Sequence, residues 1–176
     1  NYWTESGWRW RENEELDRPA DVGEPWNLPN HPVMAISWYE ASAFCRWLSE
    51  QLGYEVRLPS ETEWERAARG TDGRVYPWGE GIDLERANYT ETGIGTTSAV
   101  GCFPAGASPY GILDMIGNVW EWTRTEFQES YEDYQPDLEV NRLAVLRGGA
   151  FDFDERGVRC ASRPRYSPNF RLNSVG

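Results

Sequence analysis

Positive charge is scarce in this sequence and is not clustered. The 17 Lys and Arg residues are outnumbered by 29 Asp and Glu residues, so the formal net charge is −12. Proteins that bind the phosphate backbone of nucleic acids use clustered basic side chains, so we expect no nucleic-acid partner. No apolar run approaches the roughly 18 residues that a membrane span requires, and the polar first residues do not resemble a secretion signal. We therefore expect no membrane insertion.

Cysteine and histidine are also rare. Cys45, Cys102 and Cys160 form no CxxC motif, and His31 is the single histidine. Such cysteines fit neither a disulfide framework nor a zinc knuckle, so buried thiols are expected, with a single disulfide as the alternative. Reduced thiols favour a cytoplasmic location. A lone imidazole beside Pro32 is more typical of a packed or capping residue than of a metal ligand.

The chain is instead rich in tryptophan, glycine and proline. It has 10 Trp, 17 Gly and 11 Pro among 176 residues, a composition that favours aromatic anchors joined by turns over long helices. This length suits one hydrophobic core, so we expect a single domain over residues 1–176. The first residue is not methionine, which predicts that the domain is the C-terminal part of a longer protein.

Two short helices are predicted from the signals at their ends. Ser37–Glu40 and Ser60–Glu63 both have the spacing of a capping box. Gly53 and Gly70 then offer left-handed stops, so one helix is expected in each interval. The first interval has apolar residues at helical spacing, namely Ala41, Phe44, Cys45, Leu48 and Leu52.

Outside these helices we expect extended segments, short strands and loops. Residues 1–32 are polar and punctuated by proline, so they are expected to wrap the domain as extended segments. Short strands are expected at residues 99–104, 118–123 and 143–149, which lie among Gly, Pro and Asp. The acidic and aromatic stretch 126–140 is the expected surface excursion.

Several sequence words resemble the formylglycine-generating-enzyme (sulfatase-modifying factor) superfamily, and they occur in the family's order over residues 31–176. These words are His31-Pro32-Val33, Ser37-Trp38, Ala43-Phe44-Cys45, Arg57 to Glu65, Tyr76-Pro77-Trp78-Gly79, Gly117 to Trp122 and Leu146-Arg147-Gly148-Gly149. The resemblance implies a C-type-lectin-like α+β fold, with two short helices packed on small twisted antiparallel sheets and long irregular loops. The predicted order of two capped helices followed by short strands agrees with that fold.

The resemblance also implies a catalytic site that this sequence lacks. Catalytic members carry two cysteines shortly after the Arg-Gly-Gly word, which bind copper(I), a soft metal suited to thiolates. Here Phe153 stands about where the first cysteine would be, the second has no counterpart, and Cys160 matches a family disulfide cysteine whose partner position is Ala68. A thiol-based oxidase needs its thiols, so we expect no enzyme activity and no copper. Related iron-dependent sulfoxide synthases use several histidines, whereas this chain has only His31.

The end of the chain is similar to a different branch, the variable proteins of diversity-generating retroelements, which use this fold as a rigid frame for a hypervariable ligand-binding face. Their Arg-Gly-Gly word, first patch of assorted residues, Arg-Cys-Ala-x-Arg word and second patch correspond to residues 147–149, 151–158, 159–163 and 164–174. Aromatic and Arg side chains dominate binding hot spots. The candidate ligand-binding residues are Phe151, Asp152, Phe153, Asp154, Arg156, Arg163, Arg165, Tyr166, Asn169, Phe170, Arg171, Leu172 and Asn173.

These candidates are not expected to be equally exposed. Phe151 follows the strand that contains the Arg-Gly-Gly word, so it is expected in the core. Tyr166, Phe170 and Arg171 lie in an irregular stretch bounded by proline, so they are expected at the surface.

A calcium site is implied by the same resemblance. Calcium prefers carboxylate and carbonyl oxygens in loops, and the family's calcium loop corresponds to Asp114, Gly117, Val119 and Glu121. The alternative is that Asp114 caps a turn and Glu121 pairs with an Arg. A second family site would use Asn88 and Tyr89, but Thr92 replaces the family's Asp there, so a plain Asn-initiated turn competes with it.

The sequence therefore predicts a non-catalytic ligand-binding or display domain, and the resemblance implies diversification by a retroelement. Its ligand would be a protein or a small molecule, and the negative charge favours a cationic or neutral one. One alternative is a formylglycine-generating-type or related oxidase with a metal centre of another kind. The other is a structural accessory domain of a multidomain signalling protein.

Overall fold

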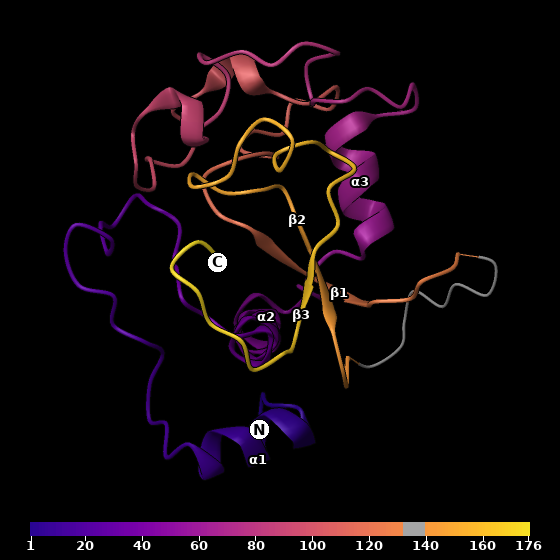
Figure 1. The fold of residues 1–176 in the computed structure, drawn as a ribbon. Helices are drawn as coiled ribbons and strands as arrows, with labels where there is room; N and C mark the ends of the chain where they lie inside the picture. Colours follow the sequence, from indigo (N-terminus) through magenta and orange to yellow (C-terminus); the bar gives the residue numbers. More distant parts are fainter. Residues whose placement is uncertain (132–139) are drawn as a thin grey trace.

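The computed structural model describes residues 1–131 and 140–176. Within these residues it has three α-helices and one three-stranded antiparallel sheet, joined by long loops (Figure 1). The helices and strands are α1 (Glu5–Asn13), α2 (Trp38–Leu52), α3 (Glu61–Arg69), β1 (Glu121–Glu126), β2 (Ala144–Arg147) and β3 (Arg165–Tyr166). Two 3-10 turns, Thr90–Thr92 and Pro104–Gly106, lie in the long connection between α3 and β1.

The two predicted helices are confirmed as α2 and α3. The amide of Ser37 donates to Glu40 Oε2 at 2.8 Å, and the Ser37 hydroxyl accepts from the amide of Glu40 at 3.3 Å. The same reciprocal box opens α3, where Ser60 and Glu63 exchange bonds of 2.8 and 3.2 Å. Gly53 ends α2 with a φ of 74°, the left-handed conformation that the sequence predicts.

The prediction for residues 1–32 is wrong at one place, because residues 5–13 form the helix α1. Thr4 caps this helix by accepting a hydrogen bond from the amide of Gly7 at 3.0 Å. Gly7 lies so close to α2 that an added Cβ would meet the Tyr39 ring at 3.0 Å, and the Trp10 and Tyr39 ring centroids are 5.6 Å apart. Packing on α2 therefore stabilises α1, although the polar sequence of residues 5–13 does not predict a helix.

The sheet has the order β1-β2-β3, and both pairings are antiparallel. The predicted strand at 143–149 is confirmed as β2, whereas the strand predicted at 118–123 begins later, at Glu121. Residues 99–104 form no strand; Gly101 has a φ of 77° and Pro104 begins a 3-10 turn. β3 lies in a segment predicted to be irregular. The stretch 126–140 overlaps residues 132–139, which lie outside the described part of the chain.

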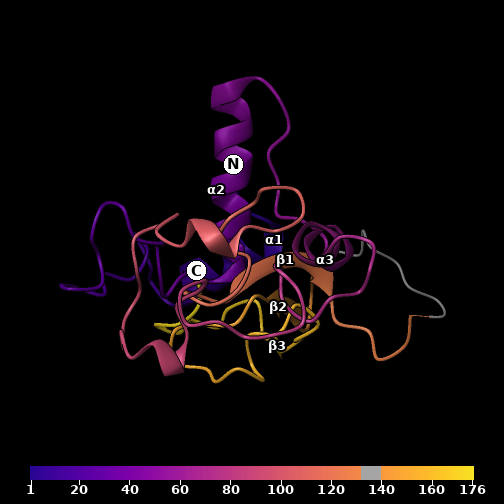
Figure 2. The same cartoon turned by 90° about the horizontal axis from the view of Figure 1, so that it is seen from above.

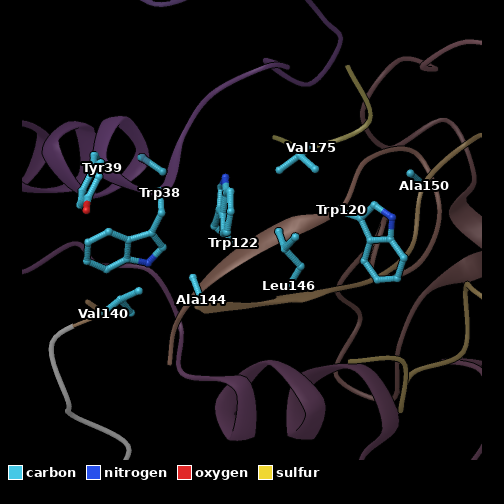
Figure 3. Packing of buried hydrophobic residues seen from close by; sticks show 10 residues of the cluster. Trp38, Tyr39, Trp120, Trp122, Val140, Ala144, Leu146, Ala150 and Val175 are labelled. Atoms are coloured by element: carbon cyan, nitrogen blue, oxygen red, sulfur yellow. The ribbon is translucent and has the colours of Figure 1, made fainter. Parts of the chain in front are cut away.

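The main core lies between α2 and the sheet (Figure 3). Trp38 and Trp122 are buried, and their indole nitrogens donate to main-chain carbonyls, Trp38 to Thr123 at 2.9 Å and Trp122 to Ile36 at 3.0 Å. Burying both the ring and its N–H partner joins the helix to the strand at fixed points. Trp38 and Trp122, which belong to the family words, therefore have a structural role in the core.

The C-terminal half of α2 and strand β3 lie toward opposite sides of the molecule. The C-terminal half of α2 stands away from the body on one side, and β3 lies toward the other side (Figure 2). The last residues of the chain return to the N-terminal end of α2, where the amide of Ala35 donates to the carbonyls of Leu172 at 3.2 Å and Val175 at 2.9 Å. Only the first turns of α2 are buried, and Phe44 and Leu52 are exposed. Among the described residues, the structure has no helix with the length and apolar character needed to cross a bilayer.

Candidate functional site

The first candidate patch follows β2 directly. Phe151 is buried, as predicted, and its ring packs on Trp26 with a centroid distance of 5.6 Å. Phe153 is 37% exposed and stands edge-on to the buried Trp120 ring at 5.1 Å. The sequence therefore places one aromatic ring in the core and, two residues later, one at the surface.

Asp154 sets the shape of this patch. Its carboxylate Oδ1 accepts hydrogen bonds from the amides of Arg156 and Gly157, both at 3.1 Å. The turn that results exposes the side chains of Asp152, Asp154 and Arg156. Gly157 is required there, because an added Cβ would lie 2.9 Å from Phe153 Cβ.

Arg163, at the end of the Arg-Cys-Ala-x-Arg word, and Arg171, in the second patch, both form ion pairs with buried glutamates and are not free for a ligand. Arg163 Nη2 donates to Glu61 Oε1 at 2.7 Å, and its Nη1 donates to the Gln128 carbonyl at 3.0 Å. Arg171 Nε donates to Glu40 Oε2 at 3.0 Å. Glu61 and Glu40 are buried at the starts of α3 and α2, so both ion pairs tie the C-terminal segment to a helix.

The expected exposure of Tyr166, Phe170 and Arg171 is therefore wrong, since all three are half-buried. The rings of Tyr166 and Phe170 stack at 4.4 Å with an interplanar angle of 2°, and both pack on the main core. Only 20% of the Arg171 side chain is exposed, and its guanidinium lies 5.0 Å from the Trp10 ring centre. Aromatic and basic residues in an irregular segment can thus belong to the frame, because the partners that bury them come from distant elements.

The remaining candidates share one property, which is that their side chains face solvent. They are Asp152, Phe153, Asp154, Arg156, Arg165, Asn169, Leu172 and Asn173. We call this set the display residues. They lie on the loop after β2 and on the segment that contains β3, and the end of this segment passes the N-terminal end of α2, where the amide of Ala35 donates to the Leu172 carbonyl at 3.2 Å.

The three cysteines differ in their surroundings. All three thiols are free, and Cys102 is exposed, which corrects the expectation that every thiol is buried. Cys160 is buried in one core cluster with Ala68, the position that the family resemblance pairs with it. Burial raises the pKa of the Cys160 thiol to about 12, so it stays protonated and unreactive near neutral pH.

The implied calcium loop contains a buried carboxylate beside a second one. Burial, together with the nearby charge of Asp114, raises the pKa of Glu121 to about 7, although Trp64 Nε1 donates to its carboxylate at 2.7 Å. The alternative expectation is that Asp114 caps a turn and Glu121 pairs with an Arg; the structure gives Glu121 the indole of Trp64 as its partner, while Asp114 Oδ2 accepts from the amide of Gly101 at 2.6 Å. Two main-chain carbonyls lie close to Gly148, because an added Cβ would lie 3.4 Å from the Met115 oxygen and 3.9 Å from that of Val119, with the Trp64 ring also at 3.4 Å. Such a donor set fits a hard cation.

The second implied site is closed by its own hydrogen bonds. The Thr92 hydroxyl lies 2.5 Å from the Tyr89 carbonyl and 3.4 Å from Asn88 Oδ1. The Asn88 carbonyl accepts from the amide of Asn118 at 2.7 Å. In the part of the chain that the structure describes, no three His, Cys, Asp or Glu side chains gather as a metal site. His31 is a packed residue, as predicted, with Nδ1 at 2.9 Å from Thr97 Oγ1.

Glu40 and Glu61 pair with Arg171 and Arg163 and so hold the C-terminal segment that carries display residues. Sequence reasoning missed both roles. The place of Glu40 in a capping box predicts a hydrogen bond from the amide of Ser37 to its carboxylate, but it does not predict the ion pair with Arg171. Nothing in the sequence near Glu61 points to Arg163, which is 102 residues away.

The curated proteins similar to this chain include both a formylglycine-generating enzyme and an inactive one. The chain is 37% identical to the inactive C-alpha-formylglycine-generating enzyme 2 of Bos taurus over 131 residues, which is 68% of this chain and 38% of that protein. It is 30% identical to the formylglycine-generating enzyme of Mus musculus over 170 residues, 84% of this chain and 43% of that protein. It is 38% identical to the serine/threonine-protein kinase pkn1 of Chlamydia caviae over 156 residues, 83% of this chain and 23% of that protein. The chain thus spans less than half the length of these relatives.

Comparison with solved structures supports the fold. Variable protein 1 of Treponema denticola superposes with a TM-score of 0.76 at 24% identity, over 91% of this chain and 73% of that one. The model of the sulfatase-modifying factor enzyme 1-like domain matches residues 1–176. The α+β fold with a small antiparallel sheet is the one that the sequence words predict. This chain therefore belongs to the sulfatase-modifying factor enzyme 1-like (formylglycine-generating-enzyme-like) family.

Proposed function

We propose that this protein is a non-catalytic ligand-binding domain whose contact surface is formed by the display residues. The observation that carries the proposal is the division of the C-terminal segment. Phe151, Arg163 and Arg171 are held by the core or by buried carboxylates, while the display residues before and after each arginine face solvent. A binding face that tolerates substitution needs exposed side chains on a rigid main chain, because the exposed residues can then change without disturbing the fold.

The chemistry of the display residues suits recognition. Phe153 offers an apolar ring that Trp120 supports from behind, and Leu172 is 41% exposed. Arg156 and Arg165 add guanidinium groups, which together with aromatic rings are enriched at the centres of interfaces. The ligand would be a protein or a small molecule with apolar groups and acceptors for these arginines.

The non-catalytic part of the proposal rests on the missing thiols. Phe153 occupies the region where the family resemblance places a catalytic cysteine, and the sequence has no cysteine between Cys102 and Cys160. Copper(I) therefore lacks soft ligands on this face. We expect no formylglycine on a cysteine-containing sulfatase peptide incubated with this protein, with or without copper.

A second candidate function is that of an accessory domain in a longer protein. The similarity to the kinase pkn1 favours it, because the matched region is only 23% of that kinase. The two functions are compatible, since an accessory domain can also bind a ligand.

Variation among closely related copies of the gene tests the display proposal. We expect amino-acid differences to concentrate at the display residues and to spare Arg163, Arg171 and Phe151, because replacing either arginine would leave a buried glutamate unpaired. The measurement is deep sequencing of the segment that encodes residues 150–176 in a natural population, together with a search for a near-copy beside a reverse transcriptase. Differences spread evenly over all these positions would contradict the proposal.

We also propose that one calcium ion is bound by Asp114 and Glu121 with carbonyls of the loop, including those of Gly117 and Val119. Saturating calcium is expected to raise the melting temperature by about 5 to 10 °C, because a ligand at 100 times its dissociation constant stabilises a domain by about 2.7 kcal/mol. Differential scanning fluorimetry in calcium and in a chelator measures this shift.

Glu121→Gln should abolish the calcium shift, because it removes one of the two charges of the site. Glu85→Gln is the matched control, since Glu85 is an exposed carboxylate outside the implied calcium loop, and it should keep the full shift. An equal calcium shift in both variants would place the ion elsewhere, and no shift in the unmodified protein would remove the calcium proposal.

A further inference from the structure

The second half of α2 carries large apolar side chains into solvent. Phe44 is 57% exposed, Trp47 41% and Leu52 47%, and Tyr54, just after the helix, is 63% exposed. Phe44, Leu48 and Leu52 are spaced by four residues, so they follow one side of the helix. Trp47 lies beside them, with its ring 5.6 Å from that of Phe44. We call these five residues the α2 stripe.

An apolar hollow lies at the base of the α2 stripe. It has a volume of about 500 Å³ and is bounded by α2, by residues around Pro32 and by residues around Pro59. Phe44 lines both the hollow and the stripe, and Val33, another lining residue, is 70% exposed. The stripe and the hollow therefore form one continuous apolar surface.

The size of this surface matches what a stable protein–protein contact needs. An aromatic side chain can bury about 150 to 250 Å², so the exposed fractions of the stripe and of Val33 correspond to about 450 Å² of apolar area. A standard interface buries about 800 Å² on each partner, of which slightly more than half is apolar. This area lies in the range of the largest apolar patch on a typical monomer, about 300 to 600 Å², and such patches are often functional.

The charges around α2 favour a partner that is itself uncharged at this surface. Gln51, the polar residue between Phe44 and Leu52 on this side, is neutral. Arg46 and Glu50 point to the other side of the helix, where Arg46 Nη1 donates to the Tyr2 carbonyl at 3.4 Å and the Tyr2 hydroxyl donates to Glu50. The five side chains of the stripe carry no charge, so a second copy of the stripe would add none to the contact. Charged residues border the contact, since Asp17 and Arg18 line a recess beside Phe44 and Trp47, and Glu40 and Glu121 line part of the hollow.

We propose that two copies of this protein associate about a twofold axis by antiparallel packing of their α2 stripes. With Leu48 near the axis, Phe44 of one copy faces Leu52 of the other, because the two positions are equally far from Leu48. The tip of each helix, with Leu52 and Tyr54, then reaches the hollow at the base of the other helix. Each copy thus supplies both the projection and the recess, as a twofold interface requires.

This pairing leaves the display residues free. The free end of α2 points away from β3 (Figure 2), so a dimer through α2 leaves the display residue on β3 outside the contact. The C-terminal residue Gly176 lines the hollow, but it is not a display residue. Two linked faces bind a multivalent ligand more tightly than one face does. The dimer does not depend on the proposed ligand-binding function, because it uses none of the display residues.

Sedimentation velocity of the purified protein at physiological salt tests the proposal. The unmodified protein should convert from monomer to dimer between about 1 and 100 µM, the range of a modest interface. Leu52→Glu places a carboxylate in the apolar contact and should weaken the dimer at least about tenfold. Val33→Glu, on the hollow, should weaken it in the same way.

Leu84→Glu is the matched control, because Leu84 is also exposed, at 55%, but lies in a distant loop. This variant should dimerise like the unmodified protein, and equal melting temperatures of the variants would show that each is folded. A monomer throughout the concentration range would overturn the proposal. A dimer that resists both Leu52→Glu and Val33→Glu, or that Leu84→Glu weakens equally, would overturn it as well.

Discussion

An Arg163→Met variant is expected to lose about 3 to 5 kcal/mol of its free energy of unfolding. The Arg163 guanidinium pairs with Glu61, whose side chain is only 1% exposed. Methionine keeps much of the volume of the side chain but removes the charge, so Glu61 would remain buried without its cation. Urea denaturation followed by tryptophan fluorescence measures the loss, which corresponds to a fall of about 6 to 20 °C in the melting temperature.

Arg165→Met is the matched control for this prediction. Arg165 lies two residues away on β3, and its exposed guanidinium stacks 4.0 Å from the Phe127 ring centre. Its replacement should cost less than about 1 kcal/mol, in line with other surface changes. Equal losses in the two variants would show that the Arg163–Glu61 pair does not anchor the display segment.

A Gly117→Ala variant is expected to lose about 4 kcal/mol or more, close to the limit of what a single substitution does. Gly117 has a φ of 74°, and an added Cβ would lie 2.2 Å from the Asn88 carbonyl oxygen. That carbonyl also accepts the amide of Asn118 at 2.7 Å, so it cannot move away without breaking a second contact. Equilibrium unfolding and the yield of folded protein measure the effect.

Gly53→Ala separates backbone strain from this close contact. Gly53 also has a φ of 74°, but nothing lies within 4 Å of an added Cβ there. The cost should therefore be only the 1 to 2 kcal/mol, approximately, of a left-handed residue with a side chain. If Gly53→Ala were as destabilising as Gly117→Ala, the tight crossing of the two loops at Asn88 would not be important for stability.

The helices α2 and α3 could be predicted because their signals are local. A capping box and a terminal glycine act within four residues of the chain, so they can be read without knowing any tertiary contact. β2 could also be predicted from local sequence, because residues 143–147 form a short, mostly apolar run that ends at Gly148 and Gly149. The family words supplied the fold, and the structure agrees with it.

The failures lie where tertiary contacts decide the outcome. Residues 5–13 have a polar, tryptophan-rich sequence and become helical because Gly7 and Trp10 pack on Tyr39. Residues 99–104 are apolar enough for a strand, but Gly101 turns the chain with a φ of 77°. The second half of α2 has the periodicity of a buried face and is nevertheless exposed. Periodicity reports which side of a helix is apolar, and it cannot report whether anything covers that side.

The sequence by itself determined which side chains follow the Arg-Gly-Gly word, because the absence of a cysteine between Cys102 and Cys160 holds in any fold. It also determined the two capped helices, whose signals act over a few residues. Only the tertiary structure decided which C-terminal side chains belong to the frame and which face a ligand. Arg163 and Arg171 meet partners 102 and 131 residues away, and the burial of Glu61 and Glu40 that makes these pairs necessary exists only once the helices have packed against the sheet and the C-terminal segment.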